Sequence, residues 1–303
     1  MKSTFTRTIG LVLLLLAALS CTKENLDRCP TTPLRLYFTF QEEEASRGAG
    51  EAPRRLDVYL FDTGEKFVGC WSDENATLEA GYYMELQDVP GGQYRVVAWA
   101  TAGDRYVTGE FLAGASSFAE AEMSLARSAG DTLRDTPLSP LLFGQHPGAI
   151  VEVGRKSQYE ITLENDVYTL NFKIEGAARN ESDYRVAVMD DNTRYRFDNS
   201  FLPAPPFHYI ATARFDNDNV LKTSMNVLRL ANGRAPRLTL RQGPDDIFSG
   251  DLVALILRAN EQGAGIDFGA TRTFDITFRV DVDASVNISI NGWDVATEEM
   301  PVS

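Results

Sequence analysis

Histidine is scarce in this chain of 303 residues, and the usual sequence signals of catalysis are missing with it. The two histidines, His146 and His208, have no second histidine or cysteine at metal-ligand spacing. No G-x-S-x-G sequence marks a nucleophile, although a Ser–His–Asp set that meets only in space stays open. We therefore expect no enzyme activity, no catalytic residue, no metal and no cofactor, and we place both histidines in loops.

Basic residues are also in the minority. The chain has 29 Lys and Arg against 43 Asp and Glu, which gives a formal net charge of −14. Such acidity argues against nucleic acid as a partner and against a polybasic contact with a membrane. It points to no small-molecule substrate. The hydrophobic fraction of 44% is enough for real cores, and the length fits two ordinary domains or one large one.

Only one apolar run is long enough to suggest a membrane signal. It covers Ile9–Leu19, follows the basic residues Lys2 and Arg7, and is too short to span a bilayer permanently. With the sequence Ala-Leu-Ser-Cys that ends at Cys21, it resembles a bacterial lipoprotein signal peptide. The resemblance implies that residues 1–20 are removed, that Cys21 is lipidated, and that residues 21–33 form a tether. The alternative is an ordinary secretory signal with an accidental cysteine.

Three cysteines are present, Cys21, Cys29 and Cys70. If Cys21 carries lipid, two remain in an exported protein, where disulfides persist. A Cys29–Cys70 disulfide would contribute at most about 4 kcal/mol in the chain-entropy model. The alternative is two unpaired thiols, and the sequence leaves both open.

Alternation of apolar and polar residues runs through most of the chain and predicts short strands joined by turns. This pattern indicates an all-β protein of β-sandwiches. The sequence Glu-Asn-Asp at 164–166 interrupts it, so we expect an N-terminal sandwich at 34–165 and a C-terminal one at 166–303. The expected strands cover 34–40, 56–61, 66–71, 82–89, 93–100, 141–144, 150–153, 158–163, 168–174, 184–189, 209–215, 224–230, 237–240, 274–282 and 286–290.

One short helix is expected, over Ser116–Arg127. Ser117 can cap it, and Glu120 completes a capping box. The continuously apolar Leu252–Leu257 is either a central strand or a short buried helix, and the neighbouring glycines favour the strand. Asp294–Ser303 is expected to be an acidic tail.

Three other features have a structural and a functional interpretation. Gly263–Gly269 lacks the spacing of a nucleotide loop and is expected to be a turn. Asp216–Asn219 could offer oxygens to Ca²⁺ but lacks the pattern of an EF-hand, so an Asx-rich turn is expected. The three tryptophans could stack on sugars, but each lies in or beside a predicted strand, which favours core packing; they are Trp71, Trp99 and Trp293.

Several stretches follow one another along nearly the whole mature chain: Cys21, Cys29-Pro30, LRLYFTF at 34–40, Leu142–Gly144, YEITLEN, YTLNFKIEG and the terminal ISINGW at 288–293. Together they resemble the fimbrillin-associated anchor family, the lipoprotein anchor subunits of fimbriae in Bacteroides-type bacteria. The alanine that begins the lipid-attachment sequence and Cys70 depart from the family pattern. The resemblance implies two transthyretin-like β-sandwich domains in tandem and a function without catalysis.

The resemblance also implies a location and a partner. The protein would sit in the outer membrane by its lipid, exposed at the cell surface, and tie fimbrial stalk subunits to the cell at the fimbrium base. Related anchors help to set filament length, and subunits join by strand exchange. The candidate exchange elements are Leu34–Phe40 and Val286–Trp293. Polymerising relatives are cut after a basic residue behind the first strand; here Arg47, Arg54 and Arg55 lie there, yet we expect the strand to be kept.

Two other classes of function remain as alternatives. A surface glycan-binding lipoprotein would show exposed, coplanar aromatic rings. A β-sandwich hydrolase would show a cleft with two carboxylates of perturbed pKa. An anchor would show an exposed or exchangeable terminal strand instead.

Overall fold

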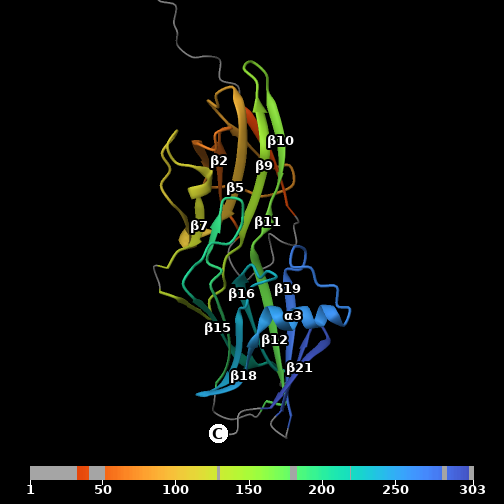
Figure 1. The fold of residues 1–303 in the computed structure, drawn as a ribbon. Coiled ribbons are helices and arrows are strands. Elements are labelled where there is room, and N and C mark those ends of the chain that lie inside the picture. The colour runs from red at the N-terminus through yellow and green to blue at the C-terminus, as the bar shows by residue number, and fades with distance from the viewer. Residues whose placement is uncertain are drawn as a thin grey trace, which may run out of the picture.

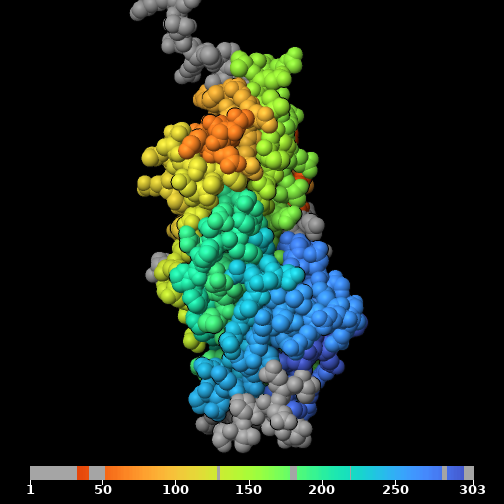
Figure 2. All heavy atoms as spheres, in the orientation of Figure 1, coloured from red at the N-terminus to blue at the C-terminus, as the bar shows by residue number. Residues whose placement is uncertain are grey.

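Strands make up more than half of the residues that the structure describes, and they run largely along the long axis of the molecule (Figure 1). The computed structural model describes residues 33–40, 52–127, 130–177, 183–218, 220–281 and 285–299. One half, drawn in red to yellow-green, lies above the other, drawn in green to blue (Figure 1). The space-filling view has the same elongated outline (Figure 2). No helix among these residues is long and apolar enough to cross a membrane.

The first half contains two sheets that pack on one another. The strand orders are β10-β1-β4 and β11-β9-β5-β2-β3. Leu36 of β1, Val58 of β2 and Val96 of β5 are all fully buried in one apolar cluster between the two sheets. The strands are β1 (Leu34–Thr39), β2 (Arg55–Phe61), β3 (Phe67–Asp73), β4 (Tyr83–Leu86), β5 (Gly92–Thr101), β6 (Tyr106–Thr108), β7 (Glu122–Leu125), β8 (Thr132–Arg134), β9 (Leu141–Val151), β10 (Ser157–Thr162) and β11 (Glu164–Asn165), with the 3₁₀ turns η1 (Gly103–Arg105) and η2 (Phe118–Glu120).

The second half is built on one long sheet of order β18-β17-β13-β15-β16-β12-β19-β20-β21, with β8 added beside β15. Its elements are β12 (Val167–Glu175), β13 (Tyr184–Asp190), β14 (Arg194–Arg196), β15 (Phe207–Phe215), β16 (Leu221–Leu228), β17 (Arg237–Gln242), β18 (Asp245–Asp251), α3 (Leu252–Glu261), β19 (Thr273–Val280), β20 (Ser285–Ile290) and β21 (Trp293–Glu299).

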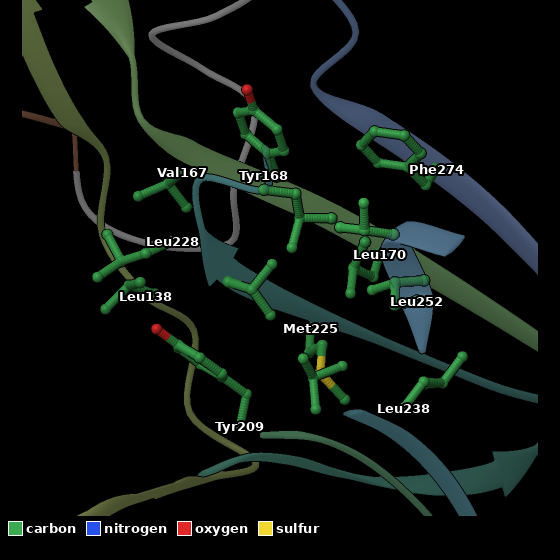
Figure 3. Packing of buried hydrophobic residues seen from close by; sticks show 14 of the residues in the cluster. Leu138, Val167, Tyr168, Leu170, Tyr209, Met225, Leu228, Leu238, Leu252 and Phe274 are labelled. Atoms are coloured by element: carbon green, nitrogen blue, oxygen red, sulfur yellow. The ribbon is translucent and has the colours of Figure 1, made fainter. Parts of the chain in front are cut away.

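The long sheet folds over at β15. That strand pairs with β13 over most of its length, but with β16 only through Arg214 and Phe215. The two arms therefore separate and enclose a common core. Figure 3 shows Leu170 and Phe274 from one arm above Tyr209 and Leu238 from the other.

The two halves are interlocked by strands that cross the boundary at residue 165. β8 precedes the boundary but pairs with β15, while β14 follows it and pairs with β7. The apolar cluster of the second half also continues under β2, β5 and β9 of the first. The division into sandwiches at 34–165 and 166–303 stays a prediction.

The helix expected over Ser116–Arg127 is wrong. The capping box does form, because Ser117 and Glu120 bond one another (Oγ to Oε2, 2.7 Å). It closes only the 3₁₀ turn η2, after which the chain becomes β7. Met123 and Leu125 of β7 are buried and alternate with Ser124. Burial of every second residue stabilises a strand here, whereas a helix over these residues would have only a thin apolar face.

The short helix lies instead at α3, where the flanking glycines favour a strand. Asp251 caps it by accepting a hydrogen bond from the N–H of Ala254 at 3.0 Å. The buried residues follow helical spacing; they are Leu252, Val253, Leu255, Ile256 and Ala259. The acidic tail expected from Asp294 is also wrong in part, since residues up to Glu299 form β21.

Candidate strand-exchange site

The first strand, β1, is the middle strand of its sheet. It pairs in parallel with β10 along its whole length and antiparallel with β4 from Leu34 to Tyr37. Leu34 and Leu36 are completely buried, and Phe38 is 2% exposed. Removing β1 would expose this apolar row together with the residues of β2 and β5 beneath it. The strand therefore fills the groove that a strand-exchange partner would otherwise occupy.

Side chains on the outer face of β1 also hold it in place. Arg35 donates to Glu85 of β4 from Nη2 at 2.6 Å and from Nε at 3.1 Å, and its guanidinium lies over the Tyr83 ring. The hydrogen bond from Arg35 lowers the pKa of Glu85. Thr39 and Thr162 of β10 are joined through their hydroxyls at 3.1 Å. Both edges of β1 are thus bonded through backbone and side chains.

Two of the three candidate cleavage residues are held by neighbouring chain. The N–H of Arg54 donates to the carbonyl of Thr101 at 3.0 Å, and its own carbonyl accepts from Ala76 at 2.8 Å. Arg55 begins β2 rather than lying in a loop. A protease needs extended, unpaired backbone, so cleavage at either residue would require local unfolding. Arg47 lies outside the described residues.

The expected C-terminal exchange element, Val286–Trp293, is divided between two strands. β20 pairs with β19 on one side and with β21 on the other, so it is internal. β21 is one of the two edge strands of the long sheet, and β18 is the other. Beneath it, Gln262 after α3 donates to the Asp294 carbonyl at 2.6 Å. An edge strand presents unpaired backbone groups, so β21 rather than β20 can pair with another chain.

Of the three cysteines, the structure describes only Cys70. Cys21 and Cys29 lie outside the described residues, so lipidation and the Cys29–Cys70 disulfide stay predictions. Cys70 is exposed on β3, with its sulfur 3.9 Å from the Ser72 hydroxyl.

The loop placement of the two histidines is wrong, because β9 and β15 extend over them. His146 packs against Tyr159 with ring centroids 4.7 Å apart, and His208 lies in β15. No group of three metal-ligating side chains occurs in the part of the chain that the structure describes.

The Asx-rich turn, the glycine-containing turn and two of the three tryptophans have structural roles. Asp216 forms the expected turn by accepting from the N–H groups of Asp218 and Val220. Gly263–Gly269 is irregular chain with turns, as expected. Trp99 is fully buried, and Trp71 donates to the Gln87 carbonyl. Trp293 is 38% exposed, so core packing is the wrong expectation for that ring.

A buried polar cluster, which we did not expect, lies where the chain passes between the halves. Asp166 is 2% exposed, and its Oδ1 is 3.6 Å from the Arg229 Nε and 3.2 Å from the Asn199 amide nitrogen. Arg272 donates to the Asn165 carbonyl at 2.9 Å. Burial raises the pKa of Asp166 to about 6, against the lowering effect of Arg229.

Stability should therefore rise on mild acidification. A folded-state pKa of about 6 for Asp166 exceeds that of an unfolded aspartate, so the folded chain binds more protons between about pH 4 and 6. We expect the free energy of unfolding to increase by about 1 kcal/mol from pH 7 to pH 5. The gain should disappear in Asp166→Asn, and urea unfolding at both pH values measures it.

Asp216→Asn is the matched control for this experiment. The hydrogen bond from Lys222 lowers the pKa of Asp216. The ionised Asp216 therefore stabilises the folded chain at higher pH, and this contribution to the free energy of unfolding decreases as the pH falls. The Asp216→Asn variant should keep the gain in stability from pH 7 to pH 5. An equal rise from pH 7 to pH 5 in wild type and Asp166→Asn would show that Asp166 is not the source.

The model of the fimbrillin-A associated anchor proteins Mfa1 and Mfa2 matches residues 26–299. The chain belongs to this family. Membership makes it a protein of the fimbrial anchor family and implies association with fimbrial subunits at the cell surface. A search of curated proteins finds no match.

Solved structures show how widely the anchor-family fold is shared. The fimbrial anchor protein Mfa2 from Porphyromonas gingivalis is 22% identical, with a TM-score of 0.72 over 88% of this chain and 100% of that one. A putative polysaccharide-binding protein from Bacteroides thetaiotaomicron is 20% identical, with a TM-score of 0.71 over 89% and 98%. A putative adhesin from Bacteroides ovatus is 20% identical, with a TM-score of 0.68 over 91% and 98%. At these identities the likeness concerns the fold alone.

Proposed function

We propose that this protein is an outer-membrane lipoprotein that anchors the base of a fimbria to the cell surface. In this proposal residues 1–20 are a removed signal peptide, Cys21 carries the lipid, and residues 21–33 form the tether. The remainder is two transthyretin-like sandwiches in tandem. The anchor binds a stalk subunit by strand exchange and limits the length of the filament. The family match over residues 26–299 is the observation that carries the proposal.

The geometry of β1 supports an anchor that keeps its first strand. A lipid on Cys21 holds the head only while the chain from Cys21 to β2 is intact or β1 stays paired. Arg54 and Arg55 are bonded into the sheet, and the buried face of β1 is complete. A Cys29–Cys70 disulfide would add a covalent connection between the tether and β3. In this proposal strand exchange with the stalk subunit takes place at β21, which is an edge strand near the other end of the chain.

Replacing Cys21 with serine tests the lipid anchor. Each buried CH₂ contributes about 0.8 kcal/mol to membrane binding, so loss of all acyl chains should release the head. We expect Cys21→Ser to move from the membrane fraction to the soluble fraction in the native kind of host. Fimbriae should detach into the medium with it, and fractionation followed by blotting for the stalk subunit measures both.

Cys70→Ser is the control, because it removes a thiol without removing the lipid site. It should stay in the membrane fraction. Wild-type protein recovered in detergent should bring a stalk subunit as a denaturant-resistant ladder. A clean monomer from cells that carry fimbriae would rule out the anchor, and a mature N-terminus at Gly48 or Arg55 would rule out retention of β1.

A further inference from the structure

Arginines gather on the outer face of one arm of the long sheet, although the protein as a whole is strongly acidic. The face is formed by β8, β15, β13, β17 and β18 in that order. It contains a hollow of about 340 Å³. The charged and imidazole side chains that line it are Arg134, Arg185, Arg237, Arg241, His208 and Asp246. Figure 1 places β15 and β18 in the lower half of the view, away from β2 and β10.

Two of these arginines make no ion pair with any residue that the structure describes. Arg134 of β8 is exposed, and its guanidinium has no partner there. Arg237 of β17 donates only to the Ser249 hydroxyl, at 2.8 Å. Arg185 and Arg241 pair with the exposed Asp183 and Asp246 at the rim. The hollow thus offers guanidinium groups that the chain itself does not neutralise.

The placement of these arginines on adjacent strands destabilises the sheet in the isolated protein. Arg185 of β13 lies directly opposite Arg241 of β17 in the strand register. Like charges directly opposite one another on adjacent strands destabilise a sheet. The uncharged residues among the arginines include the short Ala187 and Thr239 and the larger Met189 and Ile210. Guanidinium groups around such a hollow suit a ligand that brings negative charges along an extended backbone.

The chemistry of the hollow favours an acidic polypeptide over a glycan. None of its described lining residues is tryptophan, tyrosine or phenylalanine, so it offers no ring on which a sugar could stack. Arginine forms bidentate hydrogen bonds with carboxylates. Against a net charge of −14, a local group of arginines also concentrates the attraction for an acidic segment at one place.

The position of the face favours a protein partner over the membrane. Leu34 at the start of β1 pairs with Ser157, beside the β9–β10 turn, whereas Thr39 lies toward the second half. The start of β1 therefore lies at the end of the molecule with the β9–β10 turn (Figure 1). The arginine face belongs to the other half, so in the proposed anchor, with lipid at Cys21, it lies on the half farther from the start of β1.

We propose that the arginine face of β8, β15, β13, β17 and β18 binds an acidic, extended segment of the fimbrial partner subunit. This contact rests on the proposed anchor function and adds a charge-complementary surface to the strand joint. Arg134 and Arg237, which make no ion pair within the described part of the chain, hold carboxylates of the segment, and the backbone of the segment lies over the hollow that both arginines line.

A fluorescein-labelled deca-glutamate peptide is the probe, with deca-glutamine as the neutral comparison. Fluorescence anisotropy with the full chain in detergent should show binding of deca-glutamate at about 50 mM salt and its loss at about 500 mM, because salt screens exposed charges. Arg134→Glu/Arg237→Glu should weaken the binding at least tenfold. Arg155→Glu, at the β9–β10 turn, should leave it unchanged. Circular dichroism confirms that each variant is folded.

Other results would overturn the proposal. Equal binding to the double variant, or no binding of deca-glutamate by wild type, would rule out an acid-binding face. Stronger arginine-dependent binding to phosphatidylglycerol vesicles or to heparin would assign the face to lipid or glycan. In cells, the double variant should stay in the membrane fraction but lose stalk subunit. If the double variant keeps the stalk subunit while Cys21→Ser still releases fimbriae into the medium, the arginine contact is rejected and the anchor function is retained.

Discussion

Replacing Leu36 with aspartate is expected to unfold the first half of the protein. Leu36 lies at the centre of β1, has no exposed surface, and packs in the cluster between the two N-terminal sheets. The substitution removes the buried leucine and places a carboxylate where no cation lies in that cluster. We expect a loss above about 5 kcal/mol, which is comparable with the whole stability of a domain.

Thr39→Asp is the control, because Thr39 is on the same strand with its side chain exposed. It should change the free energy of unfolding by less than about 1 kcal/mol. Guanidinium unfolding monitored by circular dichroism distinguishes the two, with limited proteolysis reporting on the first half. Equal midpoints for the two variants would mean that the fold does not need β1, and the argument for its retention would fail.

Clear alternation is the part of the sequence that predicts structure well. Strands are expected at 34–40, 168–174 and 274–282, and the structure has β1, β12 and β19 there. In β12 every second residue is buried from Tyr168 onward. One buried face gives a period of two that no other element shares, so both the strand and its orientation could be predicted.

Short apolar runs and local caps are weaker guides. Leu252–Leu257 is apolar throughout, so periodicity alone does not distinguish a strand from a helix. The deciding contact is the cap made by Asp251, a residue that precedes the run. At Ser117 the capping box is real, but the packing of Met123 and Leu125 beneath η2 requires a strand. A local signal fixes one turn, and tertiary contacts decide the structure of the residues after that turn.

The arginine face and the Asp166 cluster could not be predicted from local sequence. Each arginine of the face occupies an ordinary outward position of its own strand, and only the pairing of β13 with β17 and of β8 with β15 brings them together. By sequence, Asp166 is a boundary residue. Its burial depends on Arg229 and Asn199, which come from later parts of the chain. Such sites follow from topology, which the strand pattern leaves open.

Phe197→Ala is expected to weaken the junction between the two halves. Phe197 follows β14 in the second half, yet it is fully buried and its ring touches the rings of Tyr59, Phe61 and Trp99 in the first. Centroid separations of 4.8 Å to Tyr59 and 6.0 Å to Phe61 are those of edge-to-face pairs. The cavity should cost about 3 to 5 kcal/mol.

The informative quantity is the cooperativity of unfolding rather than the loss itself. Phe278→Ala is the matched control, because Phe278 is equally buried but packs within the second half against Phe172 and Phe248. Both variants should lose similar stability. Only Phe197→Ala should split calorimetric unfolding into two transitions, because it removes the aromatic contact that makes the halves melt together. A single transition in both would show that the strand pairs β7–β14 and β8–β15 are enough to couple the unfolding of the two halves.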